Sequence, residues 1–473
     1  MSSMKATDGL GQHATLRVVL ISAAAALGGF LFGFDTAVIN GAVDAIRGSF
    51  ALSAGQIGFT VSCALLGSAL GAWYAGMLAN RFGRVRTMQV AAVLLVAAAL
   101  GSGLATAVWD LIVWRLVGGI GVGVASVIAP TYIAEVAPAR IRGRLGSMQQ
   151  LAIVLGIFAA LLSDAWLADV AGGAAGMLWM GMAAWRWMFL AATVPAVIYG
   201  LLVLAVPESP RHLVAKGRLA EARVVLQKVL NMHSEVALDR KLGDIEASLR
   251  SEHKPRLRDL CSKKTGLLPV VWIGILLSVF QQFVGINVIF YYSTTLWHSV
   301  GFSDADSFKI TVVTSIVNVL VTLVAISLVD KIGRKPLLVI GSAGMAITLG
   351  AMAWCFSQAT GTGAELSLPG ATGMVALVAA NAYVVFFGVS WGPVVWVLLG
   401  EMFPNRIRAT ALAVAAAAQW LANFAISYSF PSLAEIGLTF AYGLYAGFAL
   451  LSLLFVMYAV RETKGIELED MQA

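Results

Sequence analysis

Long apolar stretches, each followed by a short polar segment, run through almost the whole chain. A stretch of roughly twenty apolar residues is long enough for an α-helix to cross the hydrocarbon core of a bilayer. The pattern therefore predicts an all-α integral membrane protein with about twelve transmembrane helices. The first stretch is too long for the core of a signal peptide, so we expect it to remain as a helix. The expected spans are residues 16–40, 57–79, 87–108, 110–132, 146–167, 184–206, 268–297, 309–329, 337–357, 372–400, 407–430 and 437–460.

Two short polar motifs occur twice, once in each half of the chain. The segment Glu135–Gly143 returns as Glu401–Ala409, with the same order of acidic and basic residues and the same position of Pro. In the same way, Asn80–Arg84 returns as Asp330–Arg334. A duplicated membrane-embedded unit is typical of transporters built from two pseudo-symmetric halves. The repeats therefore predict two pseudo-symmetric six-helix bundles.

A long polar segment separates the two predicted bundles. We expect bundles at residues 1–206 and 267–460, a linker at 207–266 and a short cytoplasmic tail at 461–473. The copies of the two motifs are offset by 250 and 266 residues, so the second half must carry an insertion. The Gly-, Ala- and Ser-rich stretch 358–371 can hold it.

The positions of Lys and Arg predict the orientation in the membrane. Basic residues gather in alternate loops, and the intervening loops nearly lack them, with Arg47 and Lys309 as exceptions. Because loops rich in Lys and Arg stay on the cytoplasmic side, both termini are expected inside, in a multi-pass protein of the cytoplasmic membrane. The basic loop residues are Arg81, Arg84, Arg86, Arg140, Arg142, Arg144, Lys331, Arg334, Lys335, Arg406 and Arg408.

The linker is strongly basic. It holds 13 Lys and Arg against 8 Asp and Glu, a net +5 of the formal +7 of the chain. We interpret this excess as positive-inside topology and contact with the lipid bilayer, and expect no nucleic acid partner. Within the linker, residues 218–230 have apolar positions at helical spacing, which predicts an amphipathic helix.

Composition excludes several classes of protein. With 59% hydrophobic and 12% charged residues, the chain has too few charges to cover a water-soluble globule. Cys63, Cys261 and Cys355 lie far apart, which indicates neither a disulfide framework nor a metal cluster. No nucleophile and base pair, metal-ligand spacing or phosphate-binding Gly loop is found. We therefore expect no enzyme, no cofactor and no metal.

Four motifs together resemble the sugar porter family of the major facilitator superfamily. They are 76–84 (Gly-Met-Leu-Ala-Asn-Arg-Phe-Gly-Arg), Pro207–Arg211, Gln281–Asn287 and Trp391–Pro393. The similarity covers nearly the whole chain and is greatest to bacterial proton-coupled glucose and xylose symporters, with animal facilitative glucose transporters more distant. The resemblance implies the major facilitator fold, a central monosaccharide site, alternating access and a monomer.

An acid and a base are expected at the same depth. Asp35 lies near the end of the first span and Arg115 near the start of the fourth, so with a cytoplasmic amino terminus both fall in the outer part of the membrane. An ionised carboxylate there is costly unless it is paired or faces water. We expect a proton-controlled pair; the alternative is a permanent salt bridge that only joins two helices. The resemblance favours the first, because proton-coupled members carry Asp here and animal uniporters typically Asn.

Neutral polar residues are predicted near the midplane, where they suit a hydroxylated ligand. Amides offer donors and an acceptor, and aromatic faces pack against a sugar ring. The absence of a Lys or Arg cluster there argues against phosphate esters and carboxylates, and Gly285 is expected to unwind the seventh span locally. The alternative is that these amides only join helices. By resemblance, the sugar-contacting residues are Gln150, Gln281, Gln282, Asn287, Asn318, Trp396, Gln419 and Trp420, with Phe32, Tyr291 and Gly392 nearby.

The duplicated loops also predict a cytoplasmic network of ion pairs. Such a network, present in only one of two conformations, can bias the equilibrium between them. Topology alone would explain the basic residues of the loops but not the acidic ones. The expected members are Arg84, Glu135, Arg142, Glu208, Arg211, Arg334, Glu401 and Arg408.

The interpretation is therefore uptake of a monosaccharide coupled to protons. Ile157 stands where the xylose symporter has Gln and matches the animal glucose transporters, which favours a hexose such as glucose over xylose. A uniporter without proton coupling and a non-transporting sugar sensor remain alternatives.

Overall fold

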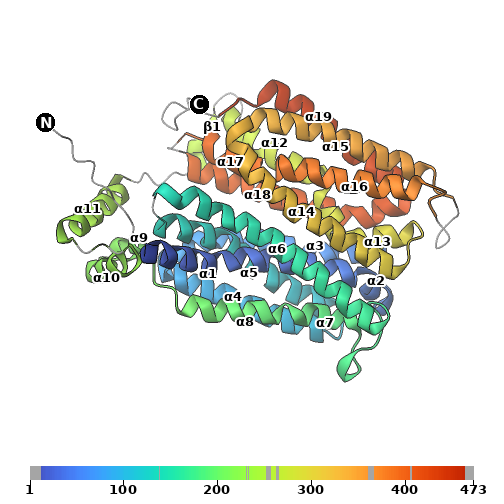
Figure 1. Ribbon diagram of the computed structural model, residues 1–473, viewed down its shortest axis with the longest axis horizontal. Helices are drawn as coiled ribbons and strands as arrows, with labels where there is room; N and C mark the ends of the chain where they lie inside the picture. The colour runs from blue at the N-terminus through green and yellow to red at the C-terminus, as the bar shows by residue number, and fades with distance from the viewer. Residues whose placement is uncertain are drawn as a thin grey trace.

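The computed structural model describes residues 12–137, 139–230, 232, 234–251, 257–262, 266–360, 367–404 and 407–463. Figure 1 shows two groups of nearly parallel helices lying one above the other, with three shorter helices beside one end. The lower group comprises α1 (Gln12–Ala37), α2 (Ile39–Ser49), α3 (Ala54–Phe82), α4 (Arg84–Leu104), α5 (Val108–Val136), α6 (Ala139–Ala171), α7 (Ala184–Ala191) and α8 (Thr193–Leu204). The upper group comprises α12 (Pro269–Phe283), α13 (Ile286–Ser299), α14 (Asp304–Ile332), α15 (Arg334–Ser357), α16 (Thr372–Val389), α17 (Trp391–Met402), α18 (Arg408–Ile436) and α19 (Leu438–Ala459).

Three short helices and a small hairpin join the two groups. The helices are α9 (Pro210–Ala215), α10 (Leu219–Leu230) and α11 (Glu235–Ser251), and the antiparallel hairpin pairs β1 (Cys261–Ser262) with β2 (Gly266–Leu267). The amphipathic helix predicted within 218–230 is confirmed as α10, whose buried apolar face packs against α9. We call the end of the molecule beside α9–α11 the linker side and the opposite end the far side. Two short 3-10 helices, Trp179–Gly181 and Leu257–Leu260, complete the described elements.

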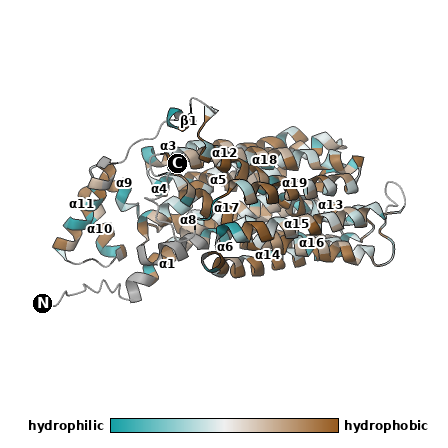
Figure 2. Ribbon diagram, turned by 90° about the horizontal axis from the view of Figure 1, so that it is seen from above, coloured by the Kyte–Doolittle hydropathy of each residue, from teal (hydrophilic) through white to brown (hydrophobic). Residues whose placement is uncertain are grey.

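The prediction of about twelve spanning helices is confirmed. The described residues contain 12 helical segments that are long and apolar enough to cross a membrane. Figure 2 shows mostly apolar ribbon along both groups and more hydrophilic ribbon in α9–α11. Large apolar side chains such as Ile347 and Val93 point outward from the helices, as expected where the solvent is lipid.

Several boundaries predicted from the sequence were wrong. The first span does not end near residue 40, because after a turn at Val38 the chain continues as α2, whose apolar face is buried. The helix expected at 146–167 is longer at both ends, as α6. Four spans are each built from two helices: α1 and α2, α7 and α8, α12 and α13, and α16 and α17.

Helix α15 ends at Ser357 and α16 begins at Thr372, whereas the corresponding connection in the first half is only 105–107. Residues 361–366 of the longer connection lie outside the described residues. The insertion expected in the second half is therefore found where the offset of the repeats predicts it.

Small residues let the helices approach closely. A Cβ added to Gly67 of α3 would lie 2.3 Å from the carbonyl oxygen of Leu116 on α5. A Cβ added to Gly119 of α5 would lie 2.0 Å from the carbonyl oxygen of Ala64 on α3. Membrane helices gain no hydrophobic driving force from one another, so such backbone contact supplies much of their packing.

Candidate functional site

The seventh span is broken where the sequence predicts it to unwind. Helix α12 ends at Phe283 and α13 begins at Ile286, and Gly285 between them has a φ of 86°. Only glycine adopts this left-handed conformation without steric cost. The break brings the amide of Asn287, from the start of α13, to Gln282 at the end of α12, to which it donates a hydrogen bond.

The amides at this break form one connected cluster. Nε2 of Gln281 donates to the carbonyl oxygen of Trp391 at 2.7 Å, and Nε2 of Gln419 on α18 donates to Oε1 of Gln281 at 2.6 Å. Nε2 of Gln282 also donates to Oε1 of Gln281, at 3.4 Å. The predicted residues Gln281, Gln282, Asn287, Gln419 and Gly392, the last through its carbonyl at 3.3 Å, are thus brought together.

The cluster has unused hydrogen-bonding capacity. Oε1 of Gln419 is buried without a hydrogen-bond partner among the described residues, and the same holds for both amide atoms of Gln149 on α6. Buried amide groups normally find partners, so these atoms are free to bond a ligand. A polyhydroxylated ligand, which offers hydroxyl donors and acceptors, fits this need.

Aromatic residues adjoin the amides and reach across the two bundles. The rings of Phe32 on α1 and Trp420 on α18 lie 5.5 Å apart between centroids. Tyr291 is buried on α13, and its hydroxyl accepts a hydrogen bond of 3.5 Å from Asn423. Of these three predicted aromatic residues, Phe32 comes from the first half of the chain, and Trp420 and Tyr291 come from the second.

Three predicted ligand residues are not part of the hydrogen-bonded cluster. Asn318 is buried on α14, beside Gly388 of α16. Gln150 is half-buried on α6, next to Gln149. Trp396 on α17 is 44% exposed. Their part in ligand binding stays a prediction.

Asp35 and Arg115 meet, as the helix directions predict. Nη1 of Arg115 lies 3.6 Å from Oδ2 of Asp35, and it donates to the backbone oxygen of the same residue at 3.0 Å. The Arg115 side chain is only 3% exposed, and its guanidinium carbon lies 5.8 Å from the centre of the Phe189 ring. At 3.6 Å the carboxylate is an ion-pair partner but not a hydrogen-bond acceptor. Oδ2 indeed has no hydrogen-bond partner among the described residues.

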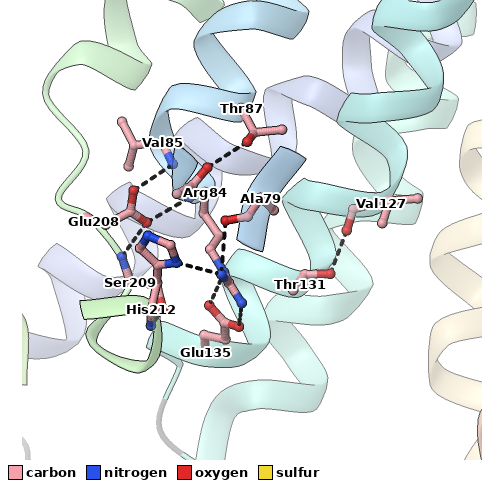
Figure 3. A network of polar contacts seen from close by, with 11 residues as sticks. Ala79, Arg84, Val85, Thr87, Val127, Thr131, Glu135, Glu208, Ser209 and His212 are labelled. Atoms are coloured by element: carbon pink, nitrogen blue, oxygen red, sulfur yellow. Dashed lines mark hydrogen bonds and ion pairs between the residues drawn. The ribbon is translucent and has the colours of Figure 1, made fainter. Parts of the chain in front are cut away.

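Arg84 is the centre of a polar network on the linker side (Figure 3). Its guanidinium donates two hydrogen bonds to the Glu135 carboxylate, at 2.9 Å from Nε and 2.7 Å from Nη2. A third nitrogen, Nη1, donates to Nδ1 of His212 at 3.0 Å. Bidentate pairs of this kind have both geometric specificity and strength.

The second half repeats this arrangement. Arg334 donates to the Glu401 carboxylate at 3.0 Å from Nε and 2.7 Å from Nη2. Thr463 also donates its hydroxyl to Glu401, at 2.6 Å. The repeat seen in the sequence is therefore also a repeat of side-chain geometry.

A distant carboxylate caps one helix in each repeat. Helices α4 and α15 have no side-chain cap from their own N-cap glycines, Gly83 and Gly333. Instead the first backbone N–H groups of α4 donate to Glu208, at 2.9 and 3.3 Å. Those of α15 donate to Glu462, at 3.0 and 2.9 Å. A negative charge at a helix N-terminus satisfies free donors and complements the helix dipole.

Glycine is required for these caps. A Cβ on Gly83 would lie 2.2 Å from Oε2 of Glu208, and one on Gly333 would lie 2.9 Å from Oε2 of Glu462. Sequence reasoning missed Glu462 and Thr463. The signal was present, because Arg461-Glu462-Thr463 follows the last span as Pro207-Glu208-Ser209 follows the sixth.

The remaining predicted network residues have different surroundings. Nε of Arg408 donates to the carbonyl of Phe403 at 3.1 Å. Arg211 lies in α9. Arg142 lies in α6, but its side chain is outside the described residues. The two bidentate ion pairs each join helices of one bundle, so closure between bundles on the linker side stays a prediction.

On the far side, α2 joins the two bundles. Nδ2 of Asn40 donates to the carbonyl of Phe290 on α13 at 2.9 Å, and Thr294 donates its hydroxyl to the backbone and side-chain oxygens of Asn40, both at 2.8 Å. Arg47 pairs with Glu435 on α18 at 2.9 Å. The far side is therefore held shut by hydrogen bonds that the sequence did not reveal.

Comparison with known proteins decides the family. A family model described as "Sugar (and other) transporter" matches residues 21–473. The chain is 57% identical to the "Glucose transport protein" of Synechocystis sp., over 96% of this chain and 97% of that protein. It is 37% identical to the "D-xylose-proton symporter" of Escherichia coli, over 98% and 96% of the two chains. The chain belongs to the sugar porter family of the major facilitator superfamily.

The fold of this sugar porter agrees with a solved structure of the family. A partially occluded inward-open conformation of the xylose transporter XylE from Escherichia coli aligns with a TM-score of 0.82 at 36% identity, covering 96% of this chain and 100% of that one. The predicted fold class and family are thus confirmed. As a sugar porter, the chain is a multi-pass membrane protein that transports monosaccharides, and it is not an enzyme. The roles assigned to individual residues stay predictions.

Proposed function

We propose that this sugar porter takes up glucose, or another hexose, together with a proton across the cytoplasmic membrane. The choice of sugar is supported by the 57% identity to a glucose transport protein. Ile157, whose backbone packs against Gly33 of α1, stands where the xylose symporter has Gln, which supports a hexose over xylose. Proton coupling is supported by the more distant likeness to a proton symporter.

The Asp35–Arg115 pair is the observation that carries the proposed coupling. The Asp35 carboxylate is only partly satisfied, because its ion pair with Arg115 is 3.6 Å long and Oδ2 accepts no hydrogen bond from a described residue. A small cavity lined by Leu31, Leu95 and Ala196 borders Asp35. Water at this place would give a proton a path to the carboxylate. Protonation would remove the charge that holds Arg115, so helices α1 and α5 would be free to change their relation.

The proposed binding site is the amide cluster at the α12–α13 break together with Phe32 and Trp420. It lies between the bundles, and both bundles contribute residues to it. Because one chain supplies every part of this site, we propose that the protein works as a monomer. We propose that the linker side faces the cytoplasm, since the loops rich in Lys and Arg lie there.

The Asp35→Asn variant tests the proposed coupling. In proteoliposomes, glucose added outside should acidify the lumen of wild-type vesicles, as reported by a trapped pH dye. The variant should lose this proton uptake while keeping glucose counterflow within a few-fold of wild type. Asp169→Asn, a change of the same chemistry at an exposed position of α6, is the matched control and should behave as wild type. Proton uptake that persists in Asp35→Asn contradicts the coupling role, and glucose entry without proton movement in wild type identifies a uniporter.

A further inference from the structure

A second buried carboxyl lies in the membrane-spanning part of the first bundle, apart from the residues described so far. Asp164 on α6 is 0% exposed. Neither Oδ1 nor Oδ2 has a hydrogen-bond partner among the described residues. An ionised carboxylate in such a place would carry a desolvation cost of several kcal/mol, and the backbone N–H of Gly41 is the only described group that acts against it, with a smaller effect than burial. Burial therefore favours the neutral acid in this conformation.

The first turn of α2 packs directly on this carboxyl. A Cβ added to Gly41 would lie 2.8 Å from Cβ of Asp164 and 2.9 Å from its Oδ2. The preceding residue, Asn40, makes the hydrogen bonds to Phe290 and Thr294 that hold the far side shut. The same turn of helix therefore covers Asp164 on one side and joins the second bundle on the other.

The charged groups on helices that pack against α6 are engaged elsewhere. On α1 and α5, Asp35 pairs with Arg115, and Asp110 accepts from the backbone of Thr106. On α7, Arg186 donates to backbone oxygens of Gly103 and Ala105. The groups on α2 and the far-side end of α14 are Asp44 bonded to Thr295, Arg47 paired with Glu435, Asp304 with His298, and Lys309 with Asp306.

No basic residue of α6 lies near Asp164. Asp169 is exposed near the end of the helix. Arg144, the nearest basic residue of α6, is twenty positions away, on the order of 30 Å at the rise of an α-helix. No described cation is thus placed to hold Asp164 as an anion.

We propose that Asp164 is a second proton-binding site of the transport cycle, neutral while α2 contacts α13 and ionised once α2 moves away. When the far side opens, the first turn of α2 no longer seals the carboxyl, water reaches it, and its proton passes to the aqueous phase on that side. Closing the far side requires the proton to return. This inference rests on the proposed function, because it adds a proton site to the cycle already assigned to Asp35.

The sign of the expected pH dependence follows from linkage. The closed state binds one more proton at Asp164 than the open state, so acid favours the closed far side and alkali the open one. One proton changes the ratio of closed to open molecules by at most about tenfold for each pH unit. A change of several-fold per unit is therefore expected over the range where Asp164 titrates.

The experiment measures the opening of the far side in the full-length protein without sugar. Spin labels are placed on Ser49→Cys at the end of α2 and Ala305→Cys near the start of α14, both exposed, after Cys63, Cys261 and Cys355 are replaced by Ser. Distance distributions are recorded by pulsed EPR in lipid nanodiscs from about pH 5 to 9. All variants also carry Asp35→Asn, so that only the second site is observed.

In the Asp35→Asn background, the population of molecules with a long distance between the labels should rise several-fold for each unit by which the pH is raised. Adding Asp164→Asn should make the population independent of pH, whereas adding Asp169→Asn should leave the rise unchanged. The proposal is overturned if the long-distance population does not depend on pH while Asp164 is intact. It is also overturned if that population still rises with pH in the Asp164→Asn variant. Failure of the Asp35 coupling role is recognised separately, by proton uptake in the single variant.

A measurement on unmutated Asp164 covers the case in which Asp164→Asn does not fold. Difference infrared spectra of the Asp35→Asn protein between about pH 6 and 9 should show the loss of a protonated carboxyl band that matches the opening seen by EPR. Opening without loss of such a band contradicts the proposal.

Discussion

At the scale of single residues, His212 places a titratable ring against a guanidinium. Nδ1 of His212 accepts a hydrogen bond from Arg84, so this nitrogen carries no proton in the network. Burial lowers the pKa of His212 below its ordinary value of 6.5, the Glu208 carboxylate raises it and Arg84 lowers it further. Protonation of the ring would make Nδ1 a donor instead of an acceptor, and it would place a second positive charge beside Arg84.

His212 therefore makes the stability of the linker-side network depend on pH. Because its pKa is lower in the folded than in the unfolded protein, unfolded molecules bind more protons, and stability is lost as the pH falls below 6.5. His212→Gln can still accept from Arg84 and does not titrate near neutrality. Thermal midpoints of the purified protein should fall less between about pH 7.5 and 5.5 in this variant than in wild type. Equal slopes would exclude His212 as the titrating group.

Residue types predicted part of the site because membrane interiors contain few charges and amides. Asp35 and Arg115 could be paired from the directions of two helices alone, and the amides of the seventh span from their spacing. Asp164 was missed although it is equally visible in the sequence. Its significance depends on the absence of a partner among the described residues, which is a property of the packed structure.

At the scale of helices, the sequence predicted spans better than breaks. Gly285 marked one break, because a left-handed residue interrupts a helix and glycine adopts that conformation readily. The breaks at Ala192 and Ser390 each lie three residues before a proline, Pro195 and Pro393, which lacks the N–H needed to continue the preceding helix. The break at Val38 has neither a glycine nor a proline at this place. Helix ends were also uncertain, since apolar residues continue past the point where a helix turns.

The remote caps of α4 and α15 give a prediction at this scale. Glu462→Gln keeps the shape of the side chain but removes the negative charge of the carboxylate, whose two oxygens accept hydrogen bonds from two backbone N–H groups of α15. We expect a loss of about 1–2 kcal/mol in unfolding free energy, and the same for Glu208→Gln at α4. Chemical denaturation in mixed micelles measures both losses.

Glu221→Gln is the matched control for these caps, because its partner Arg218 and the carboxylate are both more than half exposed. Exposed pairs of this kind contribute little to stability. A control as destabilised as Glu462→Gln would argue against a capping role.

At the scale of the whole molecule, α2 links the two bundles on the far side. The hydrogen bonds between Asn40 and Thr294 join residues 254 positions apart, and no local pattern predicts such a pair. The duplicated motifs predicted two halves, but not how the halves touch. Contact between bundles depends on the state of the transport cycle, whereas the pattern of spans is common to every state.

Thr294→Val tests whether the contact with Asn40 holds the far side closed. The variant keeps the size of the side chain but loses the hydroxyl, whose single proton is shared between two oxygens of Asn40, both at 2.8 Å. At about 0.5–1.5 kcal/mol for this hydrogen bond, the closed-to-open ratio should fall by roughly two- to tenfold. The distance between labels on Ser49→Cys and Ala305→Cys reports the shift.

Thr131→Val on α5 is the control, since its hydroxyl donates to Val127 of the same helix at 2.7 Å. Figure 3 shows this bond beside the linker-side network. If Thr131→Val opens the far side as much as Thr294→Val, the Asn40 contact does not hold it closed.

The remote caps also bear on how the protein is made. During synthesis, Glu208 follows the first residue of α4 by 124 positions, and Glu462 follows the first residue of α15 by 128 positions. In each half, the carboxylate leaves the ribosome only after all the helices of that half. A nascent chain halted just before Glu462 would therefore have a completed first half and a second half whose linker-side end is still open to rearrangement and to quality-control proteases.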